Sequence, residues 1–198
     1  MKVSKAEAAQ TRERIIETAG RLFRERGFDG IGVAELMKFA GLTHGGFYRH
    51  FASKEDLMAE ACARVLEGSL DAANQVAERS GANAVSAIAS AYLTTAHRDL
   101  PGEGCVLAAL GAEAARHGSS LRGAFTQGVR SMTDTLTRLL AGRSERARRQ
   151  RALTIYASMI GALVLARAVD DTELSEEVLE SVLASITQAD SPTGSSPL

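Results

Sequence analysis

Residues 33–57 read VAELMKFAGLTHGGFYRHFASKEDL, and this stretch decides the fold. Apolar residues recur in it at helical spacing from Val33 onward and predict a short helix that Gly41 ends. Thr43 follows, a residue type whose side-chain oxygen caps the free N–H groups at a helix start. A second short helix is therefore expected to run to about His50, and the pair predicts a helix-turn-helix between Val33 and His50.

The second of these helices has the residues that a DNA groove requires. A helix that enters the major groove exposes small or polar residues at its N-terminal end, while its other face packs on supporting helices. Residues 43–46 (THGG) form the outward end, and Phe47 and Phe51 are placed to anchor the helix. Two glycines inside a helix cost about 0.8–1 kcal/mol each relative to alanine, which suggests a close approach of Gly45 and Gly46 to a phosphate or base edge.

Residues 48–54 add groups that suit phosphate oxygens. Tyr48 offers a hydroxyl on a rigid arm, and Arg49 and His50 add positive or potentially positive groups at the same end. Lys54 lies in the first turn of the next helix, where a cation opposes the helix dipole, so a phosphate contact explains it better than helix stability. For His50, a packing role is an equally good alternative to a phosphate contact. A metal site is not expected, because the six-residue spacing from His44 to His50 puts them on different helix faces.

Residues 31–57 resemble the DNA-binding signature of the TetR/AcrR family of regulators, through A-G-L-T, a glycine-containing recognition helix, F-Y-R-H-F and S-K-E-D-L. The resemblance implies a sequence-specific, DNA-binding transcriptional regulator, most often a repressor that a small-molecule or redox signal releases from its operator. It also implies a second, variable helical domain that dimerises and often binds a small inducer. The DNA-facing set that it implies is Thr43, His44, Gly45, Gly46, Tyr48, Arg49, His50 and Lys54.

The whole chain is expected to be all-α, because no stretch alternates with a period of two. The pattern S-K-E-D at Ser53 predicts a capping box and a helix that continues to about Arg79. Further helices are expected at about 84–98, 105–117, 120–141, 145–169 and 173–188. The predicted organisation is a three-helix helix-turn-helix domain at 1–52, a helical dimerisation and ligand domain at 53–188, and a disordered tail at 189–198 rich in Pro, Gly and Ser.

The last two helices predict a homodimer. The helix at 145–169 is apolar on nearly all sides late in its length, and the helix at 173–188 has a clean apolar stripe. A dimer would place two recognition helices about 34 Å apart on double-stranded operator DNA. The helix at 53–79 would couple an inducer site to the DNA-binding domain. Candidates to line that site are Leu66, Leu93, His97, Cys105, Leu110, Phe125, Tyr156 and Ile160, most of which are equally compatible with ordinary core packing.

Two further features leave alternatives open. The run Arg143, Arg146, Arg148, Arg149 and Arg151 is interpreted as a solvated surface, with a second DNA patch or pairing with Glu173, Glu176 and Glu177 of a partner subunit as alternatives. Cys105 begins a helix after a glycine-rich loop, a position that favours a reactive thiolate. Burial is the favoured interpretation for Cys105 and for Cys62, and redox sensing is the alternative for Cys105.

Composition excludes several classes of protein. With 198 residues, 45% hydrophobic content and only three prolines, the chain can bury a sizeable core. The net charge of −1 excludes a uniformly basic nucleic-acid coat. The common nucleotide, nucleophile and zinc-protease motifs are missing, so neither an enzyme nor a cofactor is expected. No secretory leader or membrane span is predicted, which favours the cytoplasm.

Overall fold

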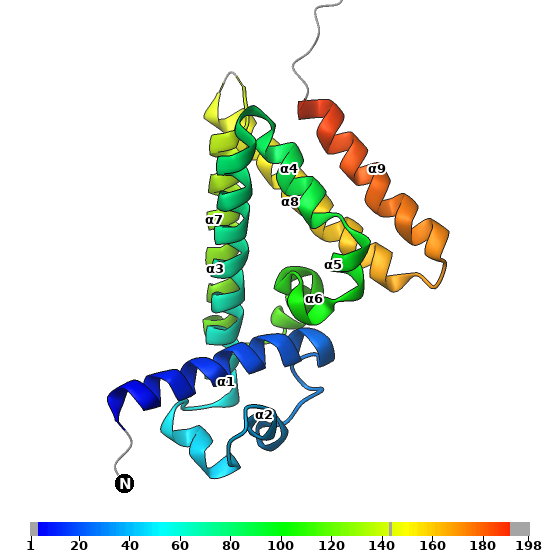
Figure 1. Cartoon of the computed structure of the whole chain (residues 1–198). Coiled ribbons are helices and arrows are strands. Elements are labelled where there is room, and N and C mark those ends of the chain that lie inside the picture. Colours follow the sequence, from blue (N-terminus) through cyan, green and yellow to red (C-terminus); the bar gives the residue numbers. More distant parts are fainter. Residues whose placement is uncertain (1–3, 143, 191–198) are drawn as a thin grey trace, which may run out of the picture. The chain divides into compact units, whose positions relative to one another are not determined.

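The computed structural model describes residues 4–142 and 144–190. Over these residues every regular element is a helix, which confirms the predicted all-α class (Figure 1). The elements are, in chain order, α1 (Lys5–Arg26), α2 (Val33–Phe39), the 3-10 helix η1 (His44–Arg49), α3 (Lys54–Ser80), η2 (Gly81–Asn83), α4 (Ala84–Tyr92), α5 (Thr95–Asp99), η3 (Pro101–Glu103), α6 (Val106–Ala114), α7 (Ser119–Leu139), α8 (Glu145–Ala168) and α9 (Thr172–Asp190).

The first helix has well-defined ends. A capping box opens α1, in which the Ser4 side chain accepts from the Glu7 N–H and the Glu7 carboxylate accepts from the Ser4 N–H. Gly27 closes α1 with φ 77°, a left-handed conformation that glycine adopts without strain, and its N–H bonds to the Phe23 carbonyl at 2.8 Å. Both ends therefore follow from local chemistry.

The described residues divide into two compact units. The first contains the residues up to Ser69 together with Leu100–Val129, and the second contains Leu70–Asp99 with the residues from Arg130 onward. The chain crosses between the units three times, inside α3, between Asp99 and Leu100, and inside α7. A functional boundary between residues 52 and 53 stays a prediction.

The core of the first unit joins the helix-turn-helix to α3, α6 and the start of α7. Its largest fully buried side chains are aromatic and aliphatic, and they come from segments far apart in sequence. Burial of such side chains contributes roughly 1.5–3 kcal/mol each relative to exposure. The most buried members include Phe23, Phe28, Phe47, Leu57, Leu110 and Leu121.

The second unit contains an antiparallel hairpin of α8 and α9, which Figure 1 shows side by side in yellow to red. Its loop end is fixed by Ser175, which is 3% exposed and donates to the Ala166 carbonyl at 2.7 Å. Arg167 reaches from α8 and donates to the His97 and Arg98 carbonyls at 2.6 and 3.0 Å. By length and composition alone α8 is apolar enough to cross a membrane, although 39% of its most apolar window is buried within the chain.

In the second unit the structure differs from the predicted helices after Tyr92 and at the C-terminus. The helix expected at 84–98 is interrupted at Leu93, because the Thr94 hydroxyl accepts from the His97 N–H at 3.1 Å and starts α5 as a separate helix. At the C-terminus α9 continues to Asp190, two residues into the expected tail. The rest of that tail lies outside the described residues.

Candidate nucleic-acid interface

The recognition segment is a 3-10 helix, His44–Arg49, and not the α-helix expected from the sequence. Thr43 is at its N-cap, as expected, but the predicted side-chain cap is wrong because the Thr43 hydroxyl makes no capping hydrogen bond. Instead the Thr43 carbonyl accepts from the Gly46 N–H at 3.0 Å. The tighter i to i+3 pattern closes the first turn through the backbone alone.

Two buried phenylalanines hold the recognition segment on the domain. Phe47 is 0% exposed and Phe51 is 2% exposed, with ring centroids 5.6 Å apart. The Arg12 guanidinium lies over the Phe51 ring, 4.6 Å from its centroid, and also pairs with Glu60 in α3. The predicted anchoring role of Phe47 and Phe51 is therefore confirmed, and Arg12 supports it from α1.

The opposite face of the same segment is open to solvent. Thr43, His44, Gly45, Tyr48 and Arg49 are exposed, and Tyr48 most clearly, at 66%. The rings of His44 and Tyr48 lie edge to face with centroids 6.3 Å apart. This face therefore presents a hydroxyl, an imidazole, a phenol and a guanidinium within two helical turns. Gly46 and His50 are half-buried at its border.

The protein itself does not require glycine at position 45. A Cβ built on Gly45 would have no neighbouring atom within 4 Å, and the backbone there does not adopt a positive φ. At Gly46 the nearest atom would be the Met37 Cε, at an ordinary 3.7 Å. Neither steric crowding nor backbone conformation inside the fold accounts for the pair. The expected close approach of a phosphate or base edge to these glycines stays a prediction.

The Lys54 side chain makes a hydrogen bond within the first unit. Its Nζ donates to the carbonyl oxygen of Phe28 at 2.5 Å, across the turn between α1 and α2. The Phe28 N–H donates in turn to the Glu113 carboxylate in α6 at 2.9 Å, and the Phe28 ring packs edge to face on His117 with centroids 5.1 Å apart. Sequence reasoning missed Phe28 and Glu113 because they lie 85 residues apart and belong to no local motif.

The start of α3 confirms only half of the expected capping box. The Ser53 hydroxyl accepts from the Asp56 N–H at 3.0 Å, as predicted. The Asp56 carboxylate, however, accepts from the N–H of Ala52, at 3.3 Å, and not from that of Ser53. Next to it, the Glu55 carboxylate accepts from the Gly118 N–H at 2.7 Å. Residues 53–56 thus join the recognition segment to the turn between α6 and α7.

Comparison with known proteins identifies this arrangement. Residues 15–61 match the profile of "Bacterial regulatory proteins, tetR family". Over 186 residues the chain is 28% identical to the HTH-type transcriptional repressor NemR of Escherichia coli K12, a match that covers 89% of this chain and 92% of NemR. Residues 15–61 therefore carry the DNA-binding domain of the TetR family. The chain is also 42% identical over 57 residues to the HTH-type transcriptional regulator AcrR of Shigella flexneri, covering 29% of this chain and 26% of AcrR.

Solved structures of TetR-family proteins share the fold over nearly the whole chain. The crystal structure of the reduced form of E. coli NemR has a TM-score of 0.76 at 27% identity and covers 90% of this chain and 96% of that one. A TetR regulator from Legionella pneumophila has a TM-score of 0.77 at 20% identity, covering 96% and 99%. The second likeness concerns the fold alone. Both span the helical region that follows the helix-turn-helix.

The eight residues predicted to line an inducer site fall in both units. Leu66, Leu110 and Phe125 belong to the apolar core of the first unit, and Cys105 is buried in the same unit. Leu93, His97, Tyr156 and Ile160 belong to the second unit. In that unit the His97 Nδ1 lies 2.7 Å from the Tyr92 carbonyl oxygen. A common cavity for the eight remains a prediction.

The second unit also contains a polar pocket of about 300 Å³ that none of those eight residues lines. Arg98 forms two hydrogen bonds with the Asp99 carboxylate, at 2.7 and 3.1 Å, and its third nitrogen donates to the Ser175 hydroxyl. These bonds hold the pKa of Asp99 below its ordinary value. The lining residues are Arg98, Asp99, Ala166, Arg167, Val169, Asp170, Asp171, Thr172 and Ser175.

Both cysteines are buried, as expected. Cys105 is 7% exposed and forms the N-cap of α6, and Cys62 is 1% exposed within the core. Burial raises the pKa of the Cys62 thiol to about 12, against the smaller, opposing effect of the Arg24 charge. Arg24 itself donates to the Gly102 carbonyl. Burial of its guanidinium also lowers the pKa of Arg24.

Proposed function

We propose that the chain binds operator DNA as a homodimer and represses transcription until a small-molecule or redox signal releases it. The observation that carries this proposal is the exposed face of η1, which displays Thr43, His44, Tyr48 and Arg49 on a base of buried Phe47. Short polar side chains on a rigid support suit the edges of bases and the phosphates of a major groove. The chain is interpreted as a regulator and not as an enzyme.

A footprint on the DNA upstream of the gene for this chain, at several salt concentrations, tests the DNA-binding role. Arg49→Ala is expected to weaken operator binding and to reduce the slope of log K against log salt by about one, because one phosphate contact is lost. Tyr48→Phe, which removes only the hydroxyl, is expected to weaken operator binding and to leave the slope of log K against log salt unchanged. Arg122→Ala, at an exposed arginine of α7, is the matched control. Normal footprints for both site variants would contradict the proposal.

The homodimer has support in the second unit. The face of α8 opposite to its buried side carries exposed apolar residues, among them Leu153, Val164 and Leu165 at 44, 41 and 57% exposure. Water-exposed apolar stripes of this kind are covered in stable assemblies. A two-fold dimer presents two recognition segments to the two halves of a palindromic site, so a symmetric footprint is expected. Burial of this face of α8 in the dimer would also explain why a helix of a cytoplasmic protein is so apolar.

The releasing signal would reach the DNA-binding end through α3. This helix continues without a break from Lys54 beside the recognition segment to Ser80 in the second unit. A ligand that binds more tightly to the conformation with α3 displaced than to the operator-binding conformation would lower operator affinity. The size of the decrease is set by the ratio of the ligand's affinities for these two conformations. Titration of the operator complex with hydrophobic effectors and with a thiol oxidant tests this step. An operator affinity that none of them changes would remove the inducible part of the proposal.

A further inference from the structure

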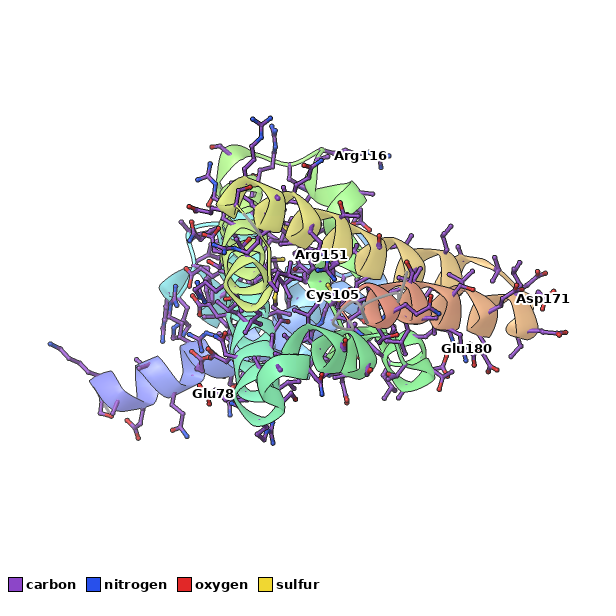
Figure 2. The ribbon with its side chains drawn as sticks, turned by 90° about the horizontal axis from the view of Figure 1, so that it is seen from above. Glu78, Cys105, Arg116, Arg151, Asp171 and Glu180 are labelled. Atoms are coloured by element: carbon purple, nitrogen blue, oxygen red, sulfur yellow. The ribbon has the colours of Figure 1, made fainter. Side chains whose placement is uncertain are left out.

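The polar pocket of the second unit lies at the turn of the α8–α9 hairpin, next to the end of α5. Figure 2 shows Asp171 at this turn and Glu180 farther along α9. The Arg98 side chain, 15% exposed, forms one wall and is held by the Asp99 carboxylate and the Ser175 hydroxyl. Ser175 is itself 3% exposed and bonds to the backbone of α8. This wall is therefore fixed before any ligand binds, as is usual for small-molecule sites.

The charges that line the pocket do not balance. Two arginines and three aspartates leave the lining with an excess of negative charge. Arg98 and Asp99 satisfy each other through two hydrogen bonds, at 2.7 and 3.1 Å. The Arg167 guanidinium donates to two backbone carbonyl groups of α5. The excess negative charge therefore lies on Asp170 and Asp171, in the turn that leads into α9.

The two aspartates of the turn differ in their partners. The Asp171 carboxylate accepts from the Leu174 N–H at 3.1 Å and so caps the first turn of α9. Asp170 is exposed, and its carboxylate has no hydrogen-bond or ion-pair partner among the residues that the structure describes. Glu173 and Glu176 add negative charge in the first turns of α9. Together these carboxylates outweigh the positive end of the α9 dipole, about half a unit charge, so the pocket favours a cation over an anion.

The lining also limits which kind of cation fits. A volume of about 300 Å³ is at the small end of ligand sites, and most groups around it are charged or polar. Within the described part of the chain, no three His, Cys, Asp or Glu side chains come together as a metal site would require. An ammonium or guanidinium group instead donates several hydrogen bonds to carboxylate and carbonyl oxygens, without a closed shell of ligands. A small organic cation therefore suits this lining.

We propose that this pocket binds a small organic cation with a primary ammonium or guanidinium group, which the carboxylates of Asp170 and Asp171 accept. The bound cation acts as the releasing signal, a part of the proposal that rests on the regulatory function proposed above. The ligand is polar and the site lies at the hairpin turn, so the site differs from the apolar inducer site expected from the sequence.

A short loop connects the pocket to α1. Asp99 ends α5, and the chain enters the first unit at the next residue, Leu100. The Gly102 carbonyl then accepts a hydrogen bond from the Arg24 guanidinium of α1. A Cβ built on Gly102 would overlap the Glu25 carboxylate, so the loop lies closely on α1. A ligand that shifts Asp99 would therefore shift the support of α1, the first helix of the predicted helix-turn-helix domain.

Titration of the full chain with agmatine, which carries both an ammonium and a guanidinium group, tests the site. NMR shifts of backbone amides are expected to saturate with a Kd of about 1 mM and to be largest for residues of the pocket. Asp170→Asn is expected to raise this Kd about tenfold, because a charge-assisted hydrogen bond is weakened. The variant should unfold at the same temperature as the unaltered chain, since Asp170 is exposed. Glu180→Gln removes the same charge from an exposed position of α9 outside the pocket, and is expected to leave the Kd unchanged.

The site would be overturned by shifts that do not saturate at about 20 mM agmatine, by equal Kd values for the two variants, or by displacement of agmatine by calcium chloride at constant ionic strength. Operator affinity measured with and without agmatine tests the signal separately. Agmatine that binds the pocket without weakening the operator complex would overturn the regulatory part alone. A chain that binds no operator even without agmatine would instead contradict the proposed function, whereas the pocket would stand on the titration.

Discussion

The Lys54 ammonium and the Phe28 carbonyl oxygen are 2.5 Å apart and hydrogen-bonded. This bond ties the first turn of α3 to the loop that follows α1, on either side of the recognition segment. The Phe28 N–H continues the connection to Glu113 in α6, so the backbone of a single residue joins three parts of the first unit. The orientation of the helix-turn-helix therefore depends on Phe28, a residue outside the predicted DNA-facing set.

Lys54→Met is expected to lower the free energy of unfolding by about 1 kcal/mol, because the Phe28 carbonyl loses its donor. Chemical denaturation measures this. If the lysine acts through Phe28 and not on phosphate, the slope of log K against log salt for operator binding stays unchanged in the variant. A slope reduced by about one would show instead that Lys54 contacts DNA.

Glu113→Ala is expected to destabilise the fold by about 1–2 kcal/mol, since the buried Phe28 N–H then lacks an acceptor. Glu113→Gln keeps an acceptor oxygen at the same position and should recover most of the loss. Hydrogen exchange at the Phe28 amide gives a local readout: rapid exchange in the alanine variant and slow exchange in the glutamine variant. Equal exchange in the two variants would contradict the assigned bond.

Gly45→Ala is expected to leave stability unchanged or slightly higher, because the added methyl group meets open space. Operator affinity is expected to fall at least about tenfold, since the methyl group would occupy the gap between backbone and DNA that glycine leaves. Gly68→Ala in α3, where a Cβ also meets open space, is the matched control. An alanine variant that binds its operator normally would leave Gly45 without a functional account.

Thr43 and Ser53 provide a paired test of helix capping. Ser53→Ala removes an oxygen that accepts from the Asp56 N–H and is expected to cost about 1 kcal/mol. Thr43→Ala is expected to cost little stability, because the Thr43 hydroxyl makes no capping bond. Its effect should appear in DNA affinity alone. Thermal unfolding of both variants checks this contrast, and a large loss for Thr43→Ala would contradict it.

Cys62 predicts a specific alkaline loss of stability. Its folded pKa of about 12 lies above the ordinary value of 9.0, so the folded chain holds the thiol proton more tightly than the unfolded chain. Stability is therefore fully present below about pH 9 and falls as the pH rises toward 12, by at most about 1.4 kcal/mol per pH unit. Cys62→Ala should have a shallower decline over that window. Parallel declines for the two proteins would refute the role of this thiol.

The sequence was sufficient where local chemistry decides the structure. Gly27 and Gly41 end α1 and α2 in left-handed conformations, and the hydroxyl of Ser53 caps the start of α3, as their residue types predict. The anchoring of Phe47 and Phe51 followed from helical spacing. These features depend on neighbours within a few residues, so a single sequence contains them.

Features that depend on distant partners were not predictable. The Phe28–Glu113 bond and the pairing of Glu55 with Gly118 join residues 63–85 positions apart, and no local pattern marks them. The 3-10 form of η1 was missed for a related reason, because helical spacing over six residues does not distinguish i to i+3 from i to i+4 bonding. The interruption at Leu93 reflects a competing side-chain bond from Thr94 that periodicity does not reveal.

Because the chain leaves its first compact unit inside α3, returns to it after Asp99 and leaves it again inside α7, the first unit is not a continuous piece of sequence. A fragment that stops after the helix-turn-helix would lack Leu110, Leu121 and the Glu113 acceptor, which complete its core. Exchange of DNA-reading parts between related regulators therefore has to transplant two segments at once. A graft of the N-terminal segment alone would leave hydrophobic surface without its natural cover.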